Sequence, residues 1–200
     1  TRDLGFSGAL INGTTNGAYL DDDRFSVLWE RASDLDVPIY IHPNNPADTP
    51  AMYQGHSEMW GPVWSWTVET GSHALRILFS GVFDRYPNAK LILGHMGETL
   101  PYQLWRFDSR WKISNRGSKK LELAPSEYFK RNFWCTTAGV CSDEPMRCAI
   151  DALGVERVMF SVDYPFERSE ETGEWIETAQ LSTSERSLVC YENAKSLLKL

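Results

Sequence analysis

The stretch AKLILGH, residues 89–95, is an apolar run that ends in a glycine and a histidine. Its residues are apolar in succession rather than at alternate positions, which is typical of a strand covered on both faces of a sheet. Four more segments have this character: GFSGALIN (5–12), VPIYIH (37–42), NFWCTT (132–137) and RVMFSVD (157–163). We therefore predict five buried strands.

Helical patterns separate the predicted strands. We expect helices up to residue 35, over residues 64–83, from residue 101 onward, over residues 145–153 and over residues 184–200, with an irregular stretch at 43–62. Asp21, Asp22 and Asp23 are candidate N-caps for the first helix, and Gly154 is a stop signal for the fourth. Buried strands that alternate with helices indicate a parallel sheet and an α/β fold.

Two architectures fit this alternation. A doubly wound sheet would suit a nucleotide-binding enzyme, but no G-x-G-x-x-G or Walker-type loop follows any predicted strand. A (β/α)8 TIM barrel is the alternative, and the chain offers about five of its eight βα units. We expect residues 1–200 to form a single domain, the C-terminal portion of a barrel whose remaining units precede Thr1.

The composition of the chain limits the classes of partner that it is expected to bind. The formal net charge is -7 and the pI is about 5.1, so no basic field favours nucleic acid, and no basic amphipathic helix favours a membrane surface. No segment approaches the roughly 20 apolar residues of a membrane span, and the first residues do not resemble a signal peptide. The four cysteines lack zinc-site and disulfide-scaffold spacing, so we expect reduced thiols and a cytoplasmic protein that binds a small molecule.

Titratable residues end three of the predicted strands. His42 ends VPIYIH, His95 ends AKLILGH and Asp163 ends RVMFSVD. In a barrel, the carboxyl ends of the strands carry the active site, so these side chains are expected to converge. Imidazole and carboxylate groups are suitable ligands for Zn2+ or Mn2+.

The other two histidines are weaker candidates. His56 lies in the irregular stretch, where we interpret it as a solvated residue, and His73 lies inside a helix, where we interpret it as a packing residue. Trp60 and Trp64 flank the irregular stretch and are candidates to line an aromatic pocket.

Several blocks of the chain carry a family resemblance. VPIYIHPNNP, ETGSHALRILFSGVFDRYPNAKLILGHMGETLPYQLWRFD, NFWCTTAGV, RVMFSVDYPFE and ENAKSLLKL follow one another along nearly the whole chain. Together they resemble the amidohydrolase-related, metal-dependent decarboxylases, and most of all the nonoxidative benzoate decarboxylases. The resemblance implies an amidohydrolase-type barrel with a divalent metal, Zn2+ or Mn2+.

The resemblance also implies roles for particular residues. His42 and Asp163 would be metal ligands, and His95 would lie near the metal, held by Glu98. The E-x-H or H-x-H pair that family members carry on the first strand is absent from these 200 residues. Half of the expected metal shell is therefore present.

The implied reaction is loss of CO2 from an ortho-hydroxylated aromatic carboxylic acid. Asp163 would protonate the ring carbon, and His95 would orient the substrate. Arg106 would pair with the anionic substrate of its own or of a neighbouring subunit. A surface salt bridge is the competing interpretation of Arg106. The family implies homodimers or homotetramers.

Two other functions stay open. One is a metal-dependent hydrolase of a lactone or amide within the same superfamily, which the shared ligands do not distinguish. The other is an inactive partial barrel with a structural role, which the missing first-strand ligands favour.

Overall fold

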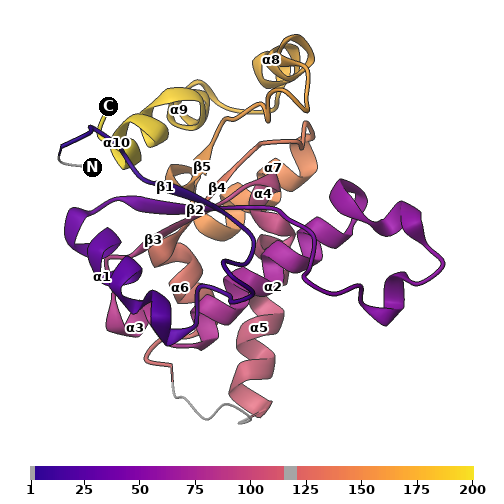
Figure 1. Ribbon diagram of the computed structural model, residues 1–200. Coiled ribbons are helices and arrows are strands. Elements are labelled where there is room, and N and C mark those ends of the chain that lie inside the picture. Colours follow the sequence, from indigo (N-terminus) through magenta and orange to yellow (C-terminus); the bar gives the residue numbers. More distant parts are fainter. Residues whose placement is uncertain (1–2, 115–120) are drawn as a thin grey trace.

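The computed structural model describes residues 3–114 and 121–200. One parallel five-stranded sheet lies at its centre, and its strands follow the same order in the sheet as in the sequence (Figure 1). The strands are β1 (Ala9–Asn12), β2 (Pro38–His42), β3 (Lys90–Leu93), β4 (Phe133–Thr136) and β5 (Val158–Met159). Successive parallel neighbours joined by helices are the arrangement of consecutive βα units in a barrel.

Helices connect and cover these strands. They are α1 (Ser26–Leu35), α2 (Ser65–Phe79), α3 (Val82–Arg85), α4 (His95–Glu98), α5 (Leu100–Ser114), α6 (Pro125–Asn132), α7 (Asp143–Leu153), α8 (Ser169–Thr178), α9 (Thr183–Ser187) and α10 (Asn193–Leu198). Short 3-10 turns lie at Asp23–Phe25, Ala51–Tyr53, Ser57–Met59, Gly61–Val63 and Val155–Arg157, and a π turn lies at Leu188–Glu192. None of the helices in the described ranges is both long and apolar enough to cross a bilayer.

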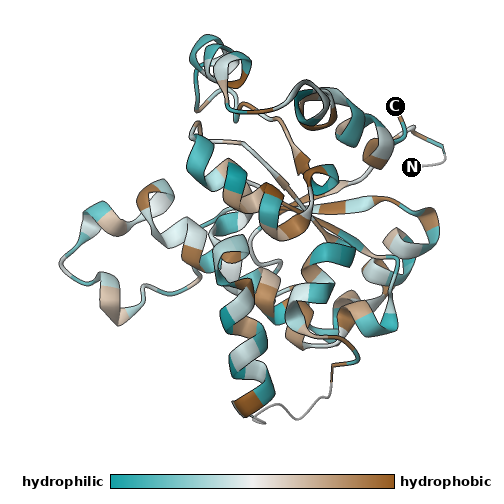
Figure 2. Ribbon diagram, turned by 180° about the vertical axis from the view of Figure 1, so that it is seen from behind, coloured by the Kyte–Doolittle hydropathy of each residue, from teal (hydrophilic) through white to brown (hydrophobic). Residues whose placement is uncertain are grey.

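The main core lies between the sheet and the helices on its outer face. Alternate strand residues such as Ile39, Ile41, Leu91 and Leu93 are fully buried there. Figure 2 shows hydrophobic residues concentrated where the helices meet the sheet. Burial of one such side chain stabilises the fold by about 1.5–3 kcal/mol, so this layer holds the strand ends in place.

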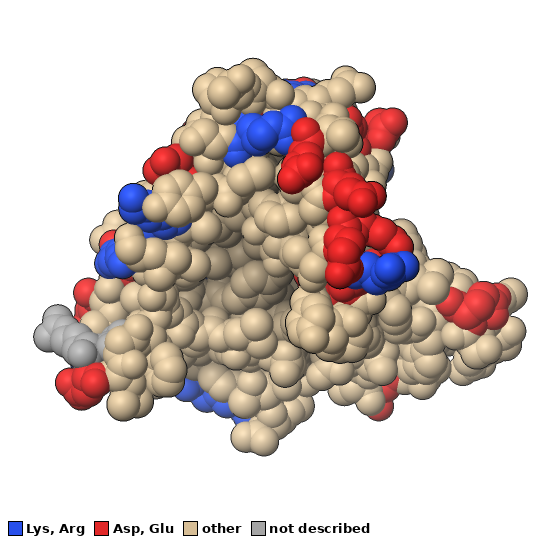
Figure 3. All heavy atoms as spheres, turned by 90° about the horizontal axis from the view of Figure 1, so that it is seen from above, with Lys and Arg blue, Asp and Glu red and all other residues tan. Residues whose placement is uncertain are grey.

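The opposite face of the sheet is more open. Its residues include Leu10, Tyr40, Ile92 and Met159, which line a cavity of about 330 Å³ that α10 covers in part. The molecule is also visibly hollowed in the view of Figure 3, where a ridge of Asp and Glu side chains borders one side of the hollow.

The prediction that the first strand is buried is wrong. β1 is shorter than the predicted 5–12 strand, and Leu10 is 57% exposed. Among the described residues β1 pairs only with β2, so it is an edge strand. Its apolar residues match the pattern of a covered strand, but within this chain nothing described covers its outer edge.

Two further predictions are corrected. The helix expected over 64–83 is interrupted after α2, because Gly81 adopts a left-handed conformation with φ 76° and α3 begins after it. The strand expected over 157–163 is regular only at Val158–Met159, because the backbone N–H of Phe160 donates to the carbonyl of Val189 instead of to a neighbouring strand.

The other helix predictions are confirmed. Asp22 caps the short turn before α1 by accepting a hydrogen bond from the N–H of Arg24, α5 begins beside Pro101, and Gly154 ends α7. The C-terminal segment is helical from α9 to α10, with the π turn between them. The stretch at 43–62 is irregular apart from its 3-10 turns.

Candidate functional site

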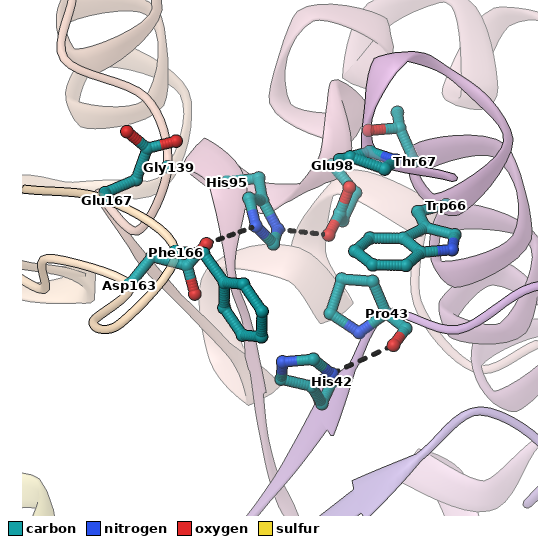
Figure 4. A pocket seen from close by; sticks show the side chains of 11 residues that line it. His42, Pro43, Trp66, Thr67, His95, Glu98, Gly139, Asp163, Phe166 and Glu167 are labelled. Atoms are coloured by element: carbon teal, nitrogen blue, oxygen red, sulfur yellow. Dashed lines mark hydrogen bonds and ion pairs between the residues drawn. The ribbon is translucent and has the colours of Figure 1, made fainter. Parts of the chain in front are cut away.

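Three strand ends bring His42, His95 and Asp163 to one cavity. His42 is the last residue of β2, His95 follows β3 after one glycine, and Asp163 lies four residues beyond β5. All three line a cavity of about 390 Å³, and Figure 4 shows their side chains directed toward a common space. The convergence expected from the sequence is therefore present in the structure.

His95 and Glu98 form a short hydrogen bond at the back of the cavity. The His95 Nδ1–H donates to Glu98 Oε1 at 2.7 Å, and Glu98 is only 1% exposed. Burial lowers the pKa of His95, but the hydrogen bond to Glu98 and the negative charges of Glu98 and Asp163 outweigh burial and raise that pKa above its ordinary value. The second oxygen, Glu98 Oε2, is buried with no partner in the described structure.

An unusual backbone turn produces this pair. The φ values of His95, Met96, Gly97, Glu98 and Thr99 are 49°, 54°, 79°, 54° and 63°, so the label α4 covers a left-handed turn. Such conformations cost about 1–3 kcal/mol for each residue other than glycine, and they persist only where the surrounding structure enforces them. The turn folds the Glu98 carboxylate back onto the imidazole that precedes it by three residues.

Asp163 faces the other side of the imidazole. Its Oδ2 lies 3.7 Å from His95 Nε2, and its backbone also has a positive φ of 77°. The His95 ring thus lies between two carboxylates, one hydrogen-bonded and one at ion-pair distance (Figure 4).

His42 has a defined tautomer. Its Nδ1 lies 2.9 Å from the carbonyl oxygen of Pro43, and because a carbonyl can only accept, Nδ1 carries the proton. In the neutral ring the lone pair is then on Nε2, the form in which imidazole binds a metal.

The donor set suits a divalent cation in part. His42 Nε2 and the Asp163 carboxylate are ligands of the right chemistry on one cavity. Within residues 3–114 and 121–200, however, no three His, Cys, Asp or Glu side chains gather closely enough to hold a metal by themselves. On β1, the residue paired with His42 is Asn12. The described residues thus offer two side chains of ligand type at this cavity, fewer than the three or four protein ligands of a zinc site.

Aromatic and proline side chains form the walls of the cavity. Trp66 and Phe166 flank the space in front of His95, with Pro43 beside His42 (Figure 4). The Trp66 indole N–H donates to Asn45 Oδ1 at 2.8 Å, which fixes the ring orientation. An aromatic ring can stack in a slot of this kind.

The aromatic residues named from the sequence are the wrong ones. Trp60 packs against Tyr53 and Trp64 is 44% exposed, and neither lines the cavity. Trp66 does, because it lies in the first turn of α2, directly after the irregular stretch. In the sequence, Trp66 is marked only by its place directly after the irregular stretch that follows His42. Trp64 shares that feature, so the sequence does not single out Trp66.

The remaining candidates lie elsewhere. His56 is exposed and pairs with Glu58 at 2.9 Å, which confirms the solvated interpretation. His73 is buried in α2, its Nε2 accepts from the N–H of Leu20 at 2.9 Å, and burial lowers its pKa to about 4, which confirms a packing role. Arg106 is exposed on α5 and does not line the cavity of its own chain.

A polar cluster at the carboxyl ends of consecutive βα units defines this chain as part of a barrel protein with its site at the usual face. It belongs to the amidohydrolase family, since the family model described as amidohydrolase matches residues 1–200.

Known proteins support this placement. The γ-resorcylate decarboxylase of Polaromonas sp. strain JS666 is 40% identical over 209 residues, which cover 100% of this chain and 64% of the relative. A solved structure of dihydroxybenzoic acid decarboxylase from Polaromonas sp. JS666, with bound manganese and the inhibitor 2-nitroresorcinol, has a TM-score of 0.92 and 40% identity over 100% of this chain and 62% of that chain. The 5-carboxyvanillate decarboxylase of Novosphingobium aromaticivorans, complexed with manganese, has a TM-score of 0.94 and 32% identity over 100% of this chain and 58% of that chain.

The predicted fold class is confirmed by these neighbours. The five parallel strands correspond to part of an amidohydrolase-type barrel, and the chain spans about 64% of the length of the curated relatives it matches.

Proposed function

We propose that the protein is a metal-dependent, nonoxidative decarboxylase of ortho-hydroxylated aromatic carboxylic acids. The observation that carries the proposal is the grouping of His42, His95 with Glu98, and Asp163 around a cavity walled by aromatic rings. The relatives named as hydroxybenzoate decarboxylases, and the manganese and nitrophenol ligands of the solved neighbours, support the same substrate class.

A divalent metal, Zn2+ or Mn2+, would be held here by His42 Nε2 and the Asp163 carboxylate, with further ligands from outside the described residues. When bound, such a metal acts as a Lewis acid toward a carboxylate and an adjacent phenolate. The ortho-hydroxyl group is therefore the feature of the substrate that we expect to be required.

Residues of this chain would donate the proton and orient the substrate. The Asp163 carboxyl would give its proton to the ring carbon that bears the carboxylate, after which the carbon–carbon bond breaks, CO2 leaves and the bonding electron pair restores the aromatic ring. His95 would donate from Nε2 to a substrate oxygen, because Glu98 holds the Nδ1 proton and raises the pKa of the ring. Trp66 and Phe166 would keep the substrate ring flat between them.

Further features of the proposal concern the assembly. Arg106 would reach the anionic substrate of a neighbouring subunit in a homodimer or homotetramer, since it is exposed on α5 and absent from its own cavity. The residues 1–200 would form one domain of this barrel. A cytoplasmic location is supported by the four free thiols.

A metal-dependent hydrolase is the second candidate. The same two metal ligands could activate a water for attack on a lactone or amide, and the family description favours that chemistry. An inactive barrel is favoured only by the incomplete ligand set of these residues.

The test is a substrate panel. The protein is expressed from its complete coding sequence, loaded with Mn2+ or Zn2+, and incubated with 2-, 3- and 4-hydroxybenzoates, with dihydroxybenzoates, and with aryl lactones and amides. We expect CO2 release from the ortho-hydroxylated acids alone. Hydrolysis of lactones or amides without CO2 release would replace the proposal with the second candidate, and inertness of the whole panel would favour the inactive barrel.

A further inference from the structure

The turn that follows β4 contains a buried threonine with an unusual pair of bonds. Thr137 is fully buried, and its hydroxyl donates to the carbonyl of Ser161 at 2.8 Å while accepting from the N–H of Ser161 at 2.9 Å. Its own N–H donates to the carbonyl of Met159 at 3.0 Å. The Thr137 side chain therefore binds both the N–H and the C=O of Ser161. These are the groups that a neighbouring strand would bind if β5 continued to residue 161.

These bonds hold the segment that presents Asp163. Ser161 precedes Asp163 by two residues, and Asp163 has a left-handed backbone that its surroundings must enforce. On the other side, the N–H groups of Phe166 and Glu167 donate to the Asp163 carbonyl at 2.9 and 3.1 Å. The backbone that carries the Asp163 carboxylate is thus held from both directions, and Thr137 ties it to the end of β4.

The same turn lies against the functional pair itself. Gly139 has a φ of 65°, and a Cβ atom at this position would stand 3.0 Å from His95 Cδ2, 3.3 Å from His95 Nε2 and 3.3 Å from Asp163 Oδ2. The last two atoms are themselves only 3.7 Å apart. A side chain at residue 139 would therefore press on both partners at once, in addition to straining the backbone.

We propose that the turn from Thr137 to Gly139 is a positioning element that sets the Asp163 carboxylate against the His95 imidazole. Thr137 fixes the segment that carries Asp163, and Gly139 leaves the space in which the two side chains meet. Thr137 does not line the cavity, and Gly139 lines it without a side chain. The inference rests on the proposed function for its catalytic consequence, but the geometry that it concerns is independent of the reaction.

Thr137→Val tests the first half of this inference, because valine keeps the shape and loses both bonds. Thr137→Ser keeps the hydroxyl and should rescue the wild-type behaviour. Thr172→Val is the matched control, since Thr172 is also a buried threonine, but its hydroxyl donates to the carbonyl of Arg168 within the α8 region and it does not line the cavity. Gly139→Ala tests the second half.

Two measurements are made on the protein expressed from its complete coding sequence: Mn2+ affinity by calorimetry, and kcat and KM with an ortho-hydroxybenzoate. We expect Thr137→Val and Gly139→Ala to weaken Mn2+ binding and lower kcat, each on the order of 10- to 100-fold, with KM changed less. Thr137→Ser and Thr172→Val should stay within about threefold of wild type.

The positioning role is overturned if Thr137→Val and Gly139→Ala both match Thr172→Val in Mn2+ affinity and in kcat. Should Thr137→Val fail to fold, Gly139→Ala and the rescue by serine decide the question by the same criteria. A wild-type protein that binds Mn2+ but releases no CO2 would contradict the proposed function alone, because the Mn2+ affinities of the variants still report on the position of Asp163.

Discussion

Replacing Glu98 by glutamine should weaken the interaction between the His95 imidazole and the carboxylate that accepts its Nδ1 proton. Glutamine keeps the size of the side chain and can still accept from Nδ1, but it removes the negative charge that lies 2.7 Å away in a site that is 1% exposed. A hydrogen bond to a charged group contributes about 1.5–3 kcal/mol and a neutral one about 0.5–1.5 kcal/mol, so a loss of roughly 1–1.5 kcal/mol should lower kcat on the order of 10-fold.

The same substitution should lower the pKa of His95. Burial alone would lower the pKa of His95, and the hydrogen bond and charge of Glu98 are the largest influences that raise it. In the metal-free protein, NMR titration of the His95 ring should show a lower pKa in Glu98→Gln than in wild type.

Glu69→Gln is the control for this variant. Glu69 is also a buried carboxylate with a short bond, accepting from the Tyr19 hydroxyl at 2.6 Å, but it does not line the cavity. We expect Glu69→Gln to leave kcat and the His95 titration near wild type. An unchanged His95 pKa in Glu98→Gln, or an equal loss of kcat in both variants, would refute the coupling.

Three further outcomes are expected. His42→Ala and Asp163→Ala should each reduce bound metal toward zero by elemental analysis, and unchanged content in both would remove them as ligands. His95→Asn should abolish turnover while metal is retained, so near-normal turnover would exclude His95 from the mechanism. The folded protein should lose stability as the pH falls from about 6.5 to 4, because the unfolded chain protonates His73 before the folded one does. The lost stability is about 3 kcal/mol, and urea titrations of wild type and His73→Gln should differ by a pH-dependent amount over that range; a constant difference would contradict the assignment.

The sequence predicted the parts of the site that follow from strand ends. His42 closes an apolar run and is followed by a proline, so its place at the tip of β2 followed from local pattern alone. The pairing of His95 with Glu98 was implied by the family resemblance, and their separation by three residues is compatible with it. The conformational basis of the pairing could not be predicted, because a left-handed turn at residues 95–99 contains only one glycine, and nothing else in the local sequence marks it.

Other features depend on residues far apart in the chain. The backbone before Asp163 leaves the sheet where Phe160 donates to Val189 and where Thr137, 24 residues before Ser161, binds the Ser161 backbone with its side chain. The exposure of β1 could not be predicted either. A run of apolar residues looks the same in the sequence whether or not a second strand pairs with it.

The central claim is that this site breaks the bond between a ring carbon and its carboxylate, with a proton delivered to that carbon. The most direct measurement is the reaction of the metal-loaded protein, expressed from its complete coding sequence, with 2,6-dihydroxybenzoate in D2O, followed by NMR of the phenolic product and assay of CO2. The account predicts equimolar CO2 and resorcinol, with a single deuteron at the carbon that carried the carboxylate, and loss of both products in Asp163→Asn. Recovery of unchanged 2,6-dihydroxybenzoate while a lactone or amide is hydrolysed by the same preparation would contradict it.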